Sequence, residues 1–345
     1  MPRKVLVTRR IPRAGLELLA QADCDVTVLQ HDEERGLSRQ ELLHSVGGCD
    51  VLLPLLTEPI DRQLMESHPA LLGIAQMAVG FDNIDVAAAT ELGIPVANTP
   101  EVLTEATADF TWAMLMSVAR RVPAAHDYMQ SGRYKIWGPN LFLGADVGSG
   151  PDGVRKVLGI VGYGRIGEAV ARRATGFDME ILAHDPSKRA IIEADEKVHW
   201  AELEELLRRA DFVTLHPPLT PRTRHLIDGD ALSRMKPTAF LINAARGPIV
   251  DESALVDALR SGQIAGAALD VYEDEPEMAS GLAVLDNVVL FPHIASATDA
   301  TRSRMAAMAA TNAVAHLEGE KAPNCVNPEV YGSPVWRQRR RRRSI

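Results

Sequence analysis

Residues 157–185 read VLGIVGYGRIGEAVARRATGFDMEILAHD and set a glycine triplet between two apolar segments. Gly162, Gly164 and Gly167 have the spacing G-x-G-x-x-G, directly after a strand-like run and at the start of an amphipathic helical pattern. Asp185 closes the next strand-like run, 18 residues after Gly167. A glycine triplet alone is a weak signal, but strand, turn, helix and acid in this order predict a βαβ unit that binds a dinucleotide.

The glycines and the acid of this stretch each have a physical role in such a site. Gly162 allows a tight turn, Gly164 lets the backbone approach a pyrophosphate at the helix N-terminus, and Gly167 allows close contact between helix and strand. Asp185 can accept hydrogen bonds from ribose hydroxyls and repels a 2′-phosphate, which favours NAD(H); NADP(H) stays possible because basic residues follow at 188–189. The candidate cofactor residues here are Gly162, Tyr163, Gly164, Arg165, Ile166, Gly167, His184, Asp185 and Pro186.

Strand-like apolar runs alternate with helical patterns along most of the chain, which is typical of α/β domains with parallel sheets. The part before residue 100 shows this alternation without a glycine fingerprint, and a second series of runs begins at residue 157. Between them, the Gly-rich segment LGADVGSGPDGVRK at residues 143–156 is predicted to be an exposed loop. The predicted fold class is therefore α/β, with two parallel-sheet domains of the Rossmann-like or flavodoxin-like kind.

The composition of the 345 residues is that of a globular protein, with 46% hydrophobic and 24% charged residues, and the length favours two domains. No apolar run is long enough to span a membrane, and the start, MPRKVLVTRR, has no secretory segment. Three scattered cysteines, Cys24, Cys49 and Cys325, lack metal-type spacing and fit a reducing compartment. We therefore expect a cytoplasmic protein without a metal site or a membrane span.

The net charge of −9 is unevenly distributed along the chain. The last fifteen residues, YGSPVWRQRRRRRSI, hold six arginines and no acid, so residues 1–330 carry −15. An acidic body argues against general binding of nucleic acid. Because blocks of like charge seldom fold, residues 331–345 are predicted to be a disordered basic tail, with contact to an anionic partner as the alternative.

Three ionisable residues follow strand-like runs in the second half of the chain. Arg246 follows AFLINAA, Glu275 follows GAALDVY and His293 follows VVLFP. In doubly wound sheets, ligands bind beyond the carboxyl ends of the strands. There an arginine can clamp a carboxylate, a histidine can exchange a proton, and a neighbouring carboxylate can orient the histidine and favour its charged form. Each residue alone is more often solvated or structural, but their joint occurrence favours catalysis.

The motifs of this half resemble one enzyme family. The glycine fingerprint is followed, in order and spacing, by NAARG (243–247), LDVYEDEP (269–276) and PHIASAT (292–298). Together they resemble the D-2-hydroxyacid dehydrogenase family over roughly residues 1–330. The resemblance implies two domains separated by an active-site cleft: a discontinuous substrate-binding domain of residues 1–100 plus 296–330, and an NAD-binding Rossmann domain of residues 101–295. It also implies a homodimer formed largely through the cofactor domain, with the aromatic segment around Trp137 as a candidate contact.

Roles for the strand-end residues come from the same resemblance. Arg246 would bind and polarise a 2-oxo acid, His293 would be the general acid–base, and Glu275 would pair with the histidine. Asp270 matches a position near the nicotinamide carboxamide. The other acids of the loop are expected to be solvated: Glu273, Asp274 and Glu277.

Further contacts are carried over by motif. The loop AVGFDNID is similar to the one whose amides hold the substrate carboxylate, here at Val79 and Gly80, with Leu55 as a further substrate contact. Pro217 replaces an apolar residue that is more usual at its position. The implied cofactor contacts outside the glycine stretch are Thr107, His216, Pro217, Thr223, Ala244, Ala245, Arg246, Asp270, His293 and Ala295.

Within the family, LLTEPID, TPEVLTEATAD and WGPNLFLGADV resemble the glyoxylate and hydroxypyruvate reductase branch, which implies NAD(P)H-dependent reduction of a small 2-oxo acid. Residues 52–61 contain no lysine or arginine for a phosphate, and Glu58 gives the loop an acidic rim. Leu141 and Met77 depart from the branch pattern, so a bulkier 2-oxo acid such as 2-ketogluconate is an alternative substrate. A further alternative is 3-phosphohydroxypyruvate. An NAD-sensing, corepressor-like binding protein and an enzyme of formate or phosphite are further alternatives.

Overall fold

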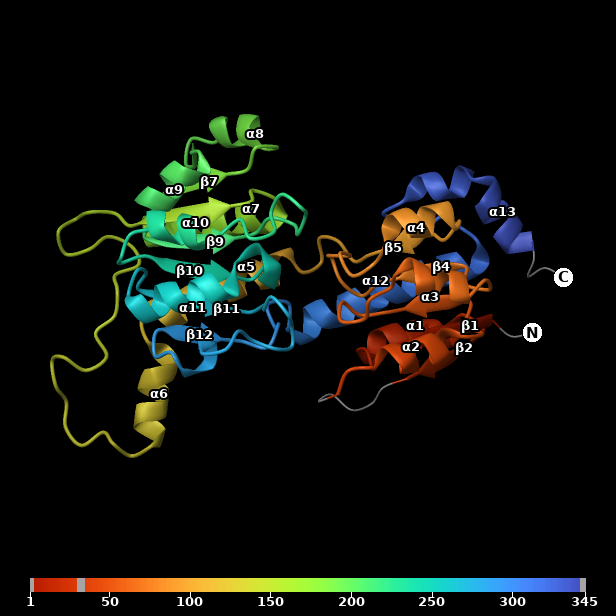
Figure 1. Cartoon of the computed structure of the whole chain (residues 1–345), viewed down its shortest axis with the longest axis horizontal. Helices are drawn as coiled ribbons and strands as arrows, with labels where there is room; N and C mark the ends of the chain where they lie inside the picture. Colours follow the sequence, from red (N-terminus) through yellow and green to blue (C-terminus); the bar gives the residue numbers. More distant parts are fainter. Residues whose placement is uncertain (1–2, 30–34, 342–345) are drawn as a thin grey trace. The chain divides into compact units, whose positions relative to one another are not determined.

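The chain forms two compact units in the computed structural model, which describes residues 3–29 and 35–341. Unit 1 comprises Met1–Leu103 and Ala297–Ile345, and unit 2 comprises Thr104–Ser296. The two stretches of unit 1 are thus separated in sequence by the whole of unit 2 (Figure 1).

Unit 1 is built on a parallel sheet whose described strands have the order β2-β1-β3-β4-β5. This is the flavodoxin-like order, in which the first strand lies inside the sheet. The strands are short apolar runs, and β3 and β4 are buried along their whole length. Their bounds are β1 (Arg3–Val7), β2 (Cys24–Val28), β3 (Val51–Leu53), β4 (Gly73–Ala75) and β5 (Val96–Ala97).

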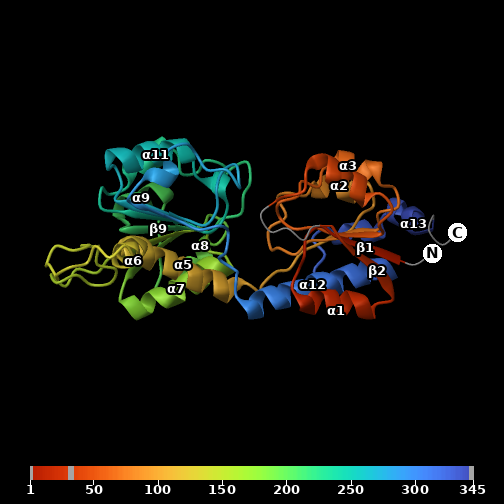
Figure 2. The ribbon, with the colours of Figure 1, turned by 90° about the horizontal axis from the view of Figure 1, so that it is seen from below.

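Helices cover both faces of this sheet (Figure 2). Leu42, Leu64 and Ala88, from α2, α3 and α4, pack on one face. Leu19 of α1 and Met305 of α12 pack on the other. The bounds are α1 (Arg13–Gln21), α2 (Arg39–Val46), α3 (Arg62–Ser67), α4 (Val86–Glu91), α12 (Asp299–Glu318), η4 (Pro328–Gly332) and α13 (Pro334–Arg341).

Side-chain caps define where several of these helices begin. Ser38 accepts a hydrogen bond from the amide of Glu41, whose carboxylate bonds back to the amide of Ser38, at the start of α2. Asp61 and Asp85 cap α3 and α4 by accepting a hydrogen bond from the amides of Leu64 and Ala88. Because caps satisfy amides that have no partner inside the helix, these polar residues set the loop lengths between strands and helices.

The predicted disorder of residues 331–345 is wrong for residues 331–341, which fold against unit 1. Arg339 donates hydrogen bonds to three backbone carbonyls, those of Pro69, Leu71 and Leu92. Arg340 donates to the carbonyl of Glu318 at 2.9 Å and lies over the ring of Trp336. Arginine side chains here satisfy helix-end and loop carbonyls, which offsets the mutual repulsion expected from charge alone. Residues 342–345 lie outside the described residues.

Unit 2, all of whose residues are described, contains a seven-stranded parallel sheet with the order β12-β11-β10-β9-β6-β7-β8. The chain order reverses at β6, which pairs with β7 on one side and β9 on the other. That reversal makes the carboxyl ends of β6 and β9 the point where a doubly wound sheet binds ligands. The bounds are β6 (Val157–Val161), β7 (Glu180–His184), β8 (His199–Trp200), β9 (Phe212–Leu215), β10 (Phe240–Asn243), β11 (Gly266–Leu269) and β12 (Val288–Leu290).

The two faces of this sheet also carry separate cores (Figure 2). Helices α9, α10 and α11 pack on one face, and α5 and α7 on the other. Alternate residues of β6 serve the two cores, with Val161 on the first face and Ile160 on the second. The bounds are α5 (Thr104–Ala119), α6 (Val122–Gln130), α7 (Arg165–Ala174), η1 (Thr175–Phe177), α8 (Arg189–Glu193), α9 (Leu203–Arg209), α10 (Gly229–Arg234), η2 (Gly247–Ile249), α11 (Glu252–Ser261) and η3 (Leu282–Val284).

The described residues include neither a candidate membrane span nor a candidate metal cluster. None of the helices there is both long and apolar enough to cross a membrane. Likewise, residues 3–29 and 35–341 contain no group of three or more metal-type side chains that could hold an ion.

Candidate active site

The glycine turn lies at the carboxyl end of β6, and its geometry requires two of the three glycines. Gly162 has φ +90°, and a Cβ there would lie 2.5 Å from the backbone nitrogen of Pro217. A Cβ on Gly167 would lie 2.2 Å from the carbonyl oxygen of Gly162. Gly164 is the N-cap of α7, and a Cβ there would meet no atom within 4 Å. The turn therefore leaves open space above the N-terminus of α7, where backbone amides can donate hydrogen bonds to a pyrophosphate.

Asp185 lies at the end of β7, beside this turn. Its Oδ2 accepts a hydrogen bond from the amide of Tyr163 at 3.0 Å. Its Oδ1 accepts bonds from the amide and hydroxyl of Ser187, at 3.0 and 2.7 Å. Arg189 is held elsewhere, with Nε 2.8 Å from Glu193 and its guanidinium over the ring of Trp200. The carboxylate is thus fixed by uncharged donors, and the basic side chain at 189 is engaged along its own helix.

The predicted adenosine-side residues lie beside the turn at the end of β9. The His216 amide donates to the carbonyl of Val161 at 2.7 Å, and burial lowers the pKa of the His216 imidazole to about 3. Pro217 packs on Gly162. The Thr223 hydroxyl donates to the carbonyl of Pro218 at 2.6 Å, so this side chain stabilises its own turn.

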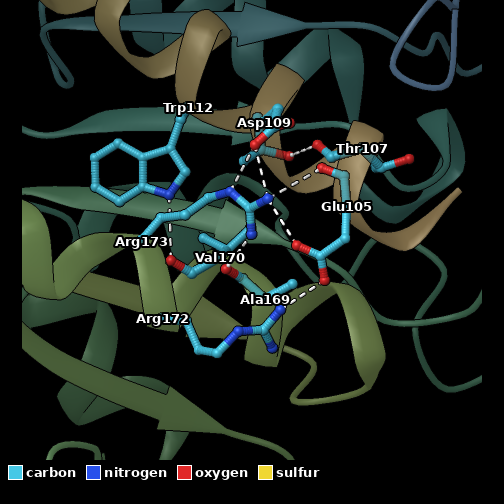
Figure 3. Close-up of polar contacts among 9 residues, drawn as sticks. Glu105, Thr107, Asp109, Trp112, Ala169, Val170, Arg172 and Arg173 are labelled. Carbon is cyan, nitrogen blue, oxygen red and sulfur yellow. Dashed lines mark hydrogen bonds and ion pairs between the residues drawn. The ribbon is translucent and has the colours of Figure 1, made fainter. Parts of the chain in front are cut away.

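A network of acids and arginines joins α5 to α7 around Thr107 (Figure 3). Thr107 is buried on α5, and Glu105 and Asp109 flank it. Arg173 of α7 binds both acids, at 2.8 and 2.7 Å. Trp112 of α5 donates from its indole nitrogen to the carbonyl of Val170 at 3.2 Å. These bonds fix the position of α5 relative to α7, the helix whose N-terminus carries the glycine turn.

Arg246 directly follows Ala244 and Ala245 at the end of β10. Asn243 orders this segment, because its amide nitrogen donates to the carbonyl of Arg246 at 2.9 Å and its oxygen accepts from the amide of Ala245. The Arg246 guanidinium is half-buried and donates to the carbonyl of Ala245 at 2.8 Å. Gly247 is essential to the path of the chain, since a Cβ there would lie 1.8 Å from the carbonyl oxygen of Tyr272.

His293 and Glu275 form a direct pair at the ends of β12 and β11. His293 Nδ1 lies 2.7 Å from Glu275 Oε1, and 22% and 28% of the two side chains are exposed. The backbone of His293 is left-handed, with φ +56°, an uncommon conformation for a residue with a side chain. Solvent therefore reaches an imidazole whose orientation a carboxylate fixes.

Asp270 holds the backbone that follows this histidine. It is fully buried at the end of β11, and its two oxygens accept hydrogen bonds from the amides of Ile294 and Ala295, both at 2.7 Å. Burial raises the pKa of the Asp270 carboxyl, and the two amide donors partly offset that effect by stabilising the carboxylate. The strained turn at His293 is thus held by a side chain from the neighbouring strand.

Glu273 is not solvated, so the expectation for that acid is wrong. Only 19% of its side chain is exposed, and Oε1 is hydrogen-bonded to Nε2 of His225. Arg224 lies 3.7 Å away, and the buried Glu252 accepts from the amide of Glu273 at 2.6 Å. Asp274 and Glu277 are exposed, as expected. Sequence reasoning missed the partners because they lie 48 and 21 residues away.

In unit 1, the predicted substrate loop follows β4. The carbonyl of Val79 accepts from the side chain of Asn98 at 2.7 Å, and that of Gly80 accepts from Gln76 at 2.6 Å. In the described part of the chain, the amides of Val79 and Gly80 donate no hydrogen bond. Asn83 bonds to Gln76, so two side-chain amides hold this loop in shape.

The loop after β3 differs from its expectation. Glu58 is buried, with Oε2 accepting from the hydroxyl of Thr8 at 2.8 Å and from the amide of Leu55 at 2.7 Å. It therefore shapes the Leu55 loop from inside and forms no acidic rim. Cations are present at the same edge, because Arg9 and Arg10 follow β1 after Thr8. Their position after a strand was a signal that sequence reasoning passed over.

Comparison with known proteins assigns this arrangement to a family. Residues 112–295, more than half of the chain, match the D-isomer specific 2-hydroxyacid dehydrogenase, NAD binding domain. The chain belongs to the D-2-hydroxyacid dehydrogenase family. A glyoxylate reductase of Korarchaeum cryptofilum is 49% identical over 333 residues, covering 96% of this chain and 97% of that protein.

Two crystal structures of similar proteins share the fold over nearly the whole chain. A Thermus thermophilus protein has a TM-score of 0.85 and 44% identity, covering 94% of this chain and 99% of its own. An NADPH-dependent glyoxylate/hydroxypyruvate reductase of Sinorhizobium meliloti, in complex with NADP and malonate, has a TM-score of 0.80 and 30% identity, covering 95% and 98%. The predicted family and its glyoxylate reductase branch are confirmed, and the protein is a nicotinamide-dependent D-2-hydroxyacid dehydrogenase.

Proposed function

We propose that this dehydrogenase reduces glyoxylate or hydroxypyruvate to the D-2-hydroxy acid, with NADH as the preferred cofactor. The observation that carries the proposal is the His293–Glu275 pair, 2.7 Å apart at the carboxyl edge of the sheet that holds the glycine turn. Full-length similarity to glyoxylate reductases supports the substrate class.

The proposed chemistry divides among three strand ends and one loop. Bound NADH supplies the hydride that reaches C2 of the oxo acid. The Arg246 guanidinium clamps the substrate and polarises its carbonyl, and the amides of Val79 and Gly80 bind the carboxylate. His293 donates the proton to the oxygen at C2, and Glu275, 2.7 Å from the imidazole, orients it.

The cofactor residues of this chain fit a dinucleotide. Gly162 and Gly167 permit the turn, the α7 N-terminus faces open space, and Thr107 is fixed to α7 through α5. The preference for NADH rests on Asp185, whose carboxylate would meet a 2′-phosphate as like charge. Arg189, one of the two basic residues at 188–189 that could offset this repulsion, is paired with Glu193.

A panel of 2-oxo acids assayed with NADH and NADPH tests the proposal. We expect glyoxylate or hydroxypyruvate with NADH to give the highest kcat/KM. Higher kcat/KM for 3-phosphohydroxypyruvate would point to Arg9 and Arg10 as a phosphate site and contradict the substrate assignment. Tight NADH binding without turnover on any 2-oxo acid would favour the corepressor-like alternative.

Glu275→Gln tests the roles of the catalytic pair. The substitution removes the negative charge beside the imidazole but keeps the shape of the pair. Reduction, which needs a proton on His293, should show a pH profile displaced towards acid. Oxidation of the hydroxy acid, which needs neutral imidazole, should stay active to lower pH. An unchanged profile in both directions would contradict the assignment.

A homodimer is part of the same proposal. The segment between α5 and β6 exposes large apolar side chains, with Ile136 80% and Trp137 72% exposed. Burial of such a patch by a second copy removes apolar surface from water. Trp137→Glu should convert a dimer to a monomer in light scattering. A wild-type chain that is monomeric at micromolar concentration would refute this part.

A further inference from the structure

The loop that carries Glu275 contains a second imidazole–carboxylate pair. Glu273 precedes Glu275 by two residues, and its Oε1 is hydrogen-bonded to Nε2 of His225. Glu273 is mostly buried, whereas the neighbouring Asp274 is exposed. The pair lies outside the chemistry of His293, so its position calls for another role.

His225 belongs to the segment that leads out of the predicted adenosine-side loop. Its backbone is left-handed, with φ +50°, and its amide donates to the carbonyl of Pro248 at 2.8 Å. Two residues on, the amide of Ile227 donates to the carbonyl of Ile249. This segment therefore pairs with the backbone immediately after Arg246 and Gly247.

The backbone at Glu273 is also in direct contact with the Arg246 segment. Gly247 packs so closely on Tyr272 and Glu273 that a Cβ would lie 1.8 Å from the carbonyl oxygen of Tyr272. Glu252, at the start of α11, accepts from the amide of Glu273 at 2.6 Å and from that of Ala279 at 2.8 Å. The loop between these two amides contains Glu275, so Glu252 anchors both ends of the turn that carries it.

The charged groups that face Glu273 come from two elements. Arg224 and His225 face it from the segment before α10, and Glu252 faces it from α11. Glu273 thus links three segments. These are the segment after the adenosine-side residues, the segment after Arg246, and the loop that carries Glu275. A misplacement of about 1 Å at a reacting group can lower turnover by about a hundredfold. A contact that fixes these segments relative to one another therefore affects the turnover rate.

We propose that Glu273 and His225 form a positioning pair that sets Glu275 against His293 and holds the Arg246 segment in register with it. Neither residue of this pair touches substrate. Both act through Glu275 and Arg246, so this inference rests on the proposed function.

Glu273→Ala tests the pair, with Asp274→Ala as the matched control in the same loop. Glu273→Ala should lower kcat by about tenfold or more, change the Kd of NADH by less than about twofold, and displace the reductive pH profile towards acid, as Glu275→Gln does. Asp274→Ala should keep wild-type values. Glu273→Gln keeps an acceptor for His225 and should recover most of the activity.

A double variant separates positioning from simple loss of stability. If Glu273 acts through Glu275, Glu273→Ala combined with Glu275→Gln should have the kcat of Glu275→Gln alone, within about twofold. Multiplying effects, or a wild-type pH profile in Glu273→Ala, would overturn the inference. If Glu273→Ala does not fold, His225→Ala, which removes the same bond from the other side, decides by the same criteria. A wild-type profile in Glu275→Gln would instead overturn the proposed function, which makes the two failures distinguishable.

Discussion

Asp270→Asn is expected to loosen the turn at His293 more than its small chemical change suggests. The wild-type side chain is fully buried and accepts two amide hydrogen bonds of 2.7 Å, one on each oxygen. An asparagine offers one acceptor oxygen, and its amide group would face the second N–H with another donor. One bond to a charged acceptor is lost, the other becomes neutral, and one buried amide is left without a partner.

The magnitude follows from the bonds that change. A hydrogen bond to a charged group contributes about 1.5–3 kcal/mol, and a neutral one about half of that. The substitution should therefore lower the free energy of unfolding of unit 2 by about 3 kcal/mol. For a unit of this size, that corresponds to a fall in Tm of about 6–12 °C. Turnover should fall as well, because the left-handed backbone of His293 is no longer held.

Calorimetry of the unligated protein measures the unit 2 transition, and steady-state kinetics measures turnover. Asp286→Asn is the matched control, because Asp286 is an exposed acid that lies just before β12, the strand that leads to His293. A Tm for Asp270→Asn within about 2 °C of the wild type would refute the reasoning, since it would mean that the two short bonds contribute nothing.

Three further outcomes are expected. Asp185→Ala should narrow the ratio of kcat/KM between NADH and NADPH, and an unchanged ratio would remove Asp185 from cofactor selection. Arg173→Met should raise the KM for NADH several-fold with little change in kcat, because α5 and Thr107 lose their anchor on α7; Arg172→Met, at a more exposed position, should do less. Burial lowers the pKa of His316 on α12 to about 4, so the unfolded state binds a proton more tightly and unit 1 should lose up to about 3 kcal/mol as the pH falls from about 6.5 to 4. Urea unfolding at neutral and acid pH should show that the His316→Leu variant loses less unfolding free energy than the wild type as the pH falls. Equal losses of unfolding free energy would contradict this.

The features that sequence predicted best are those encoded within a few residues. The glycine turn and Asp185 belong to one βαβ unit, so a local pattern was enough to place them at the edge of the sheet. The strand-end positions of Arg246, Glu275 and His293 could be predicted because strand ends in a parallel sheet converge, whatever the details of the loops.

The features that sequence missed depend on partners far along the chain. Glu58 is buried because Thr8, fifty residues earlier, donates to it. Glu273 is mostly buried because its carboxylate is hydrogen-bonded to His225 and its backbone amide donates to Glu252. Likewise, Arg339 binds three carbonyls near positions 69–92, so a run of arginines that resembles a disordered tail forms a helix on unit 1. Charge patterns describe repulsion between neighbours and contain no information about such distant acceptors.

The division of unit 1 into two stretches has a consequence for biosynthesis. The face of its sheet formed by Val5, Val7 and Leu53 packs against Met305 and Ala309 of α12, and α12 is translated about 200 residues after the rest of that sheet. Translation adds about 5–20 residues per second, so this apolar face stays without α12 for roughly 10–40 s. Unit 2, continuous in sequence, is complete on the ribosome before α12 emerges. Nascent unit 1 is therefore the stage at which this dehydrogenase most needs protection from aggregation.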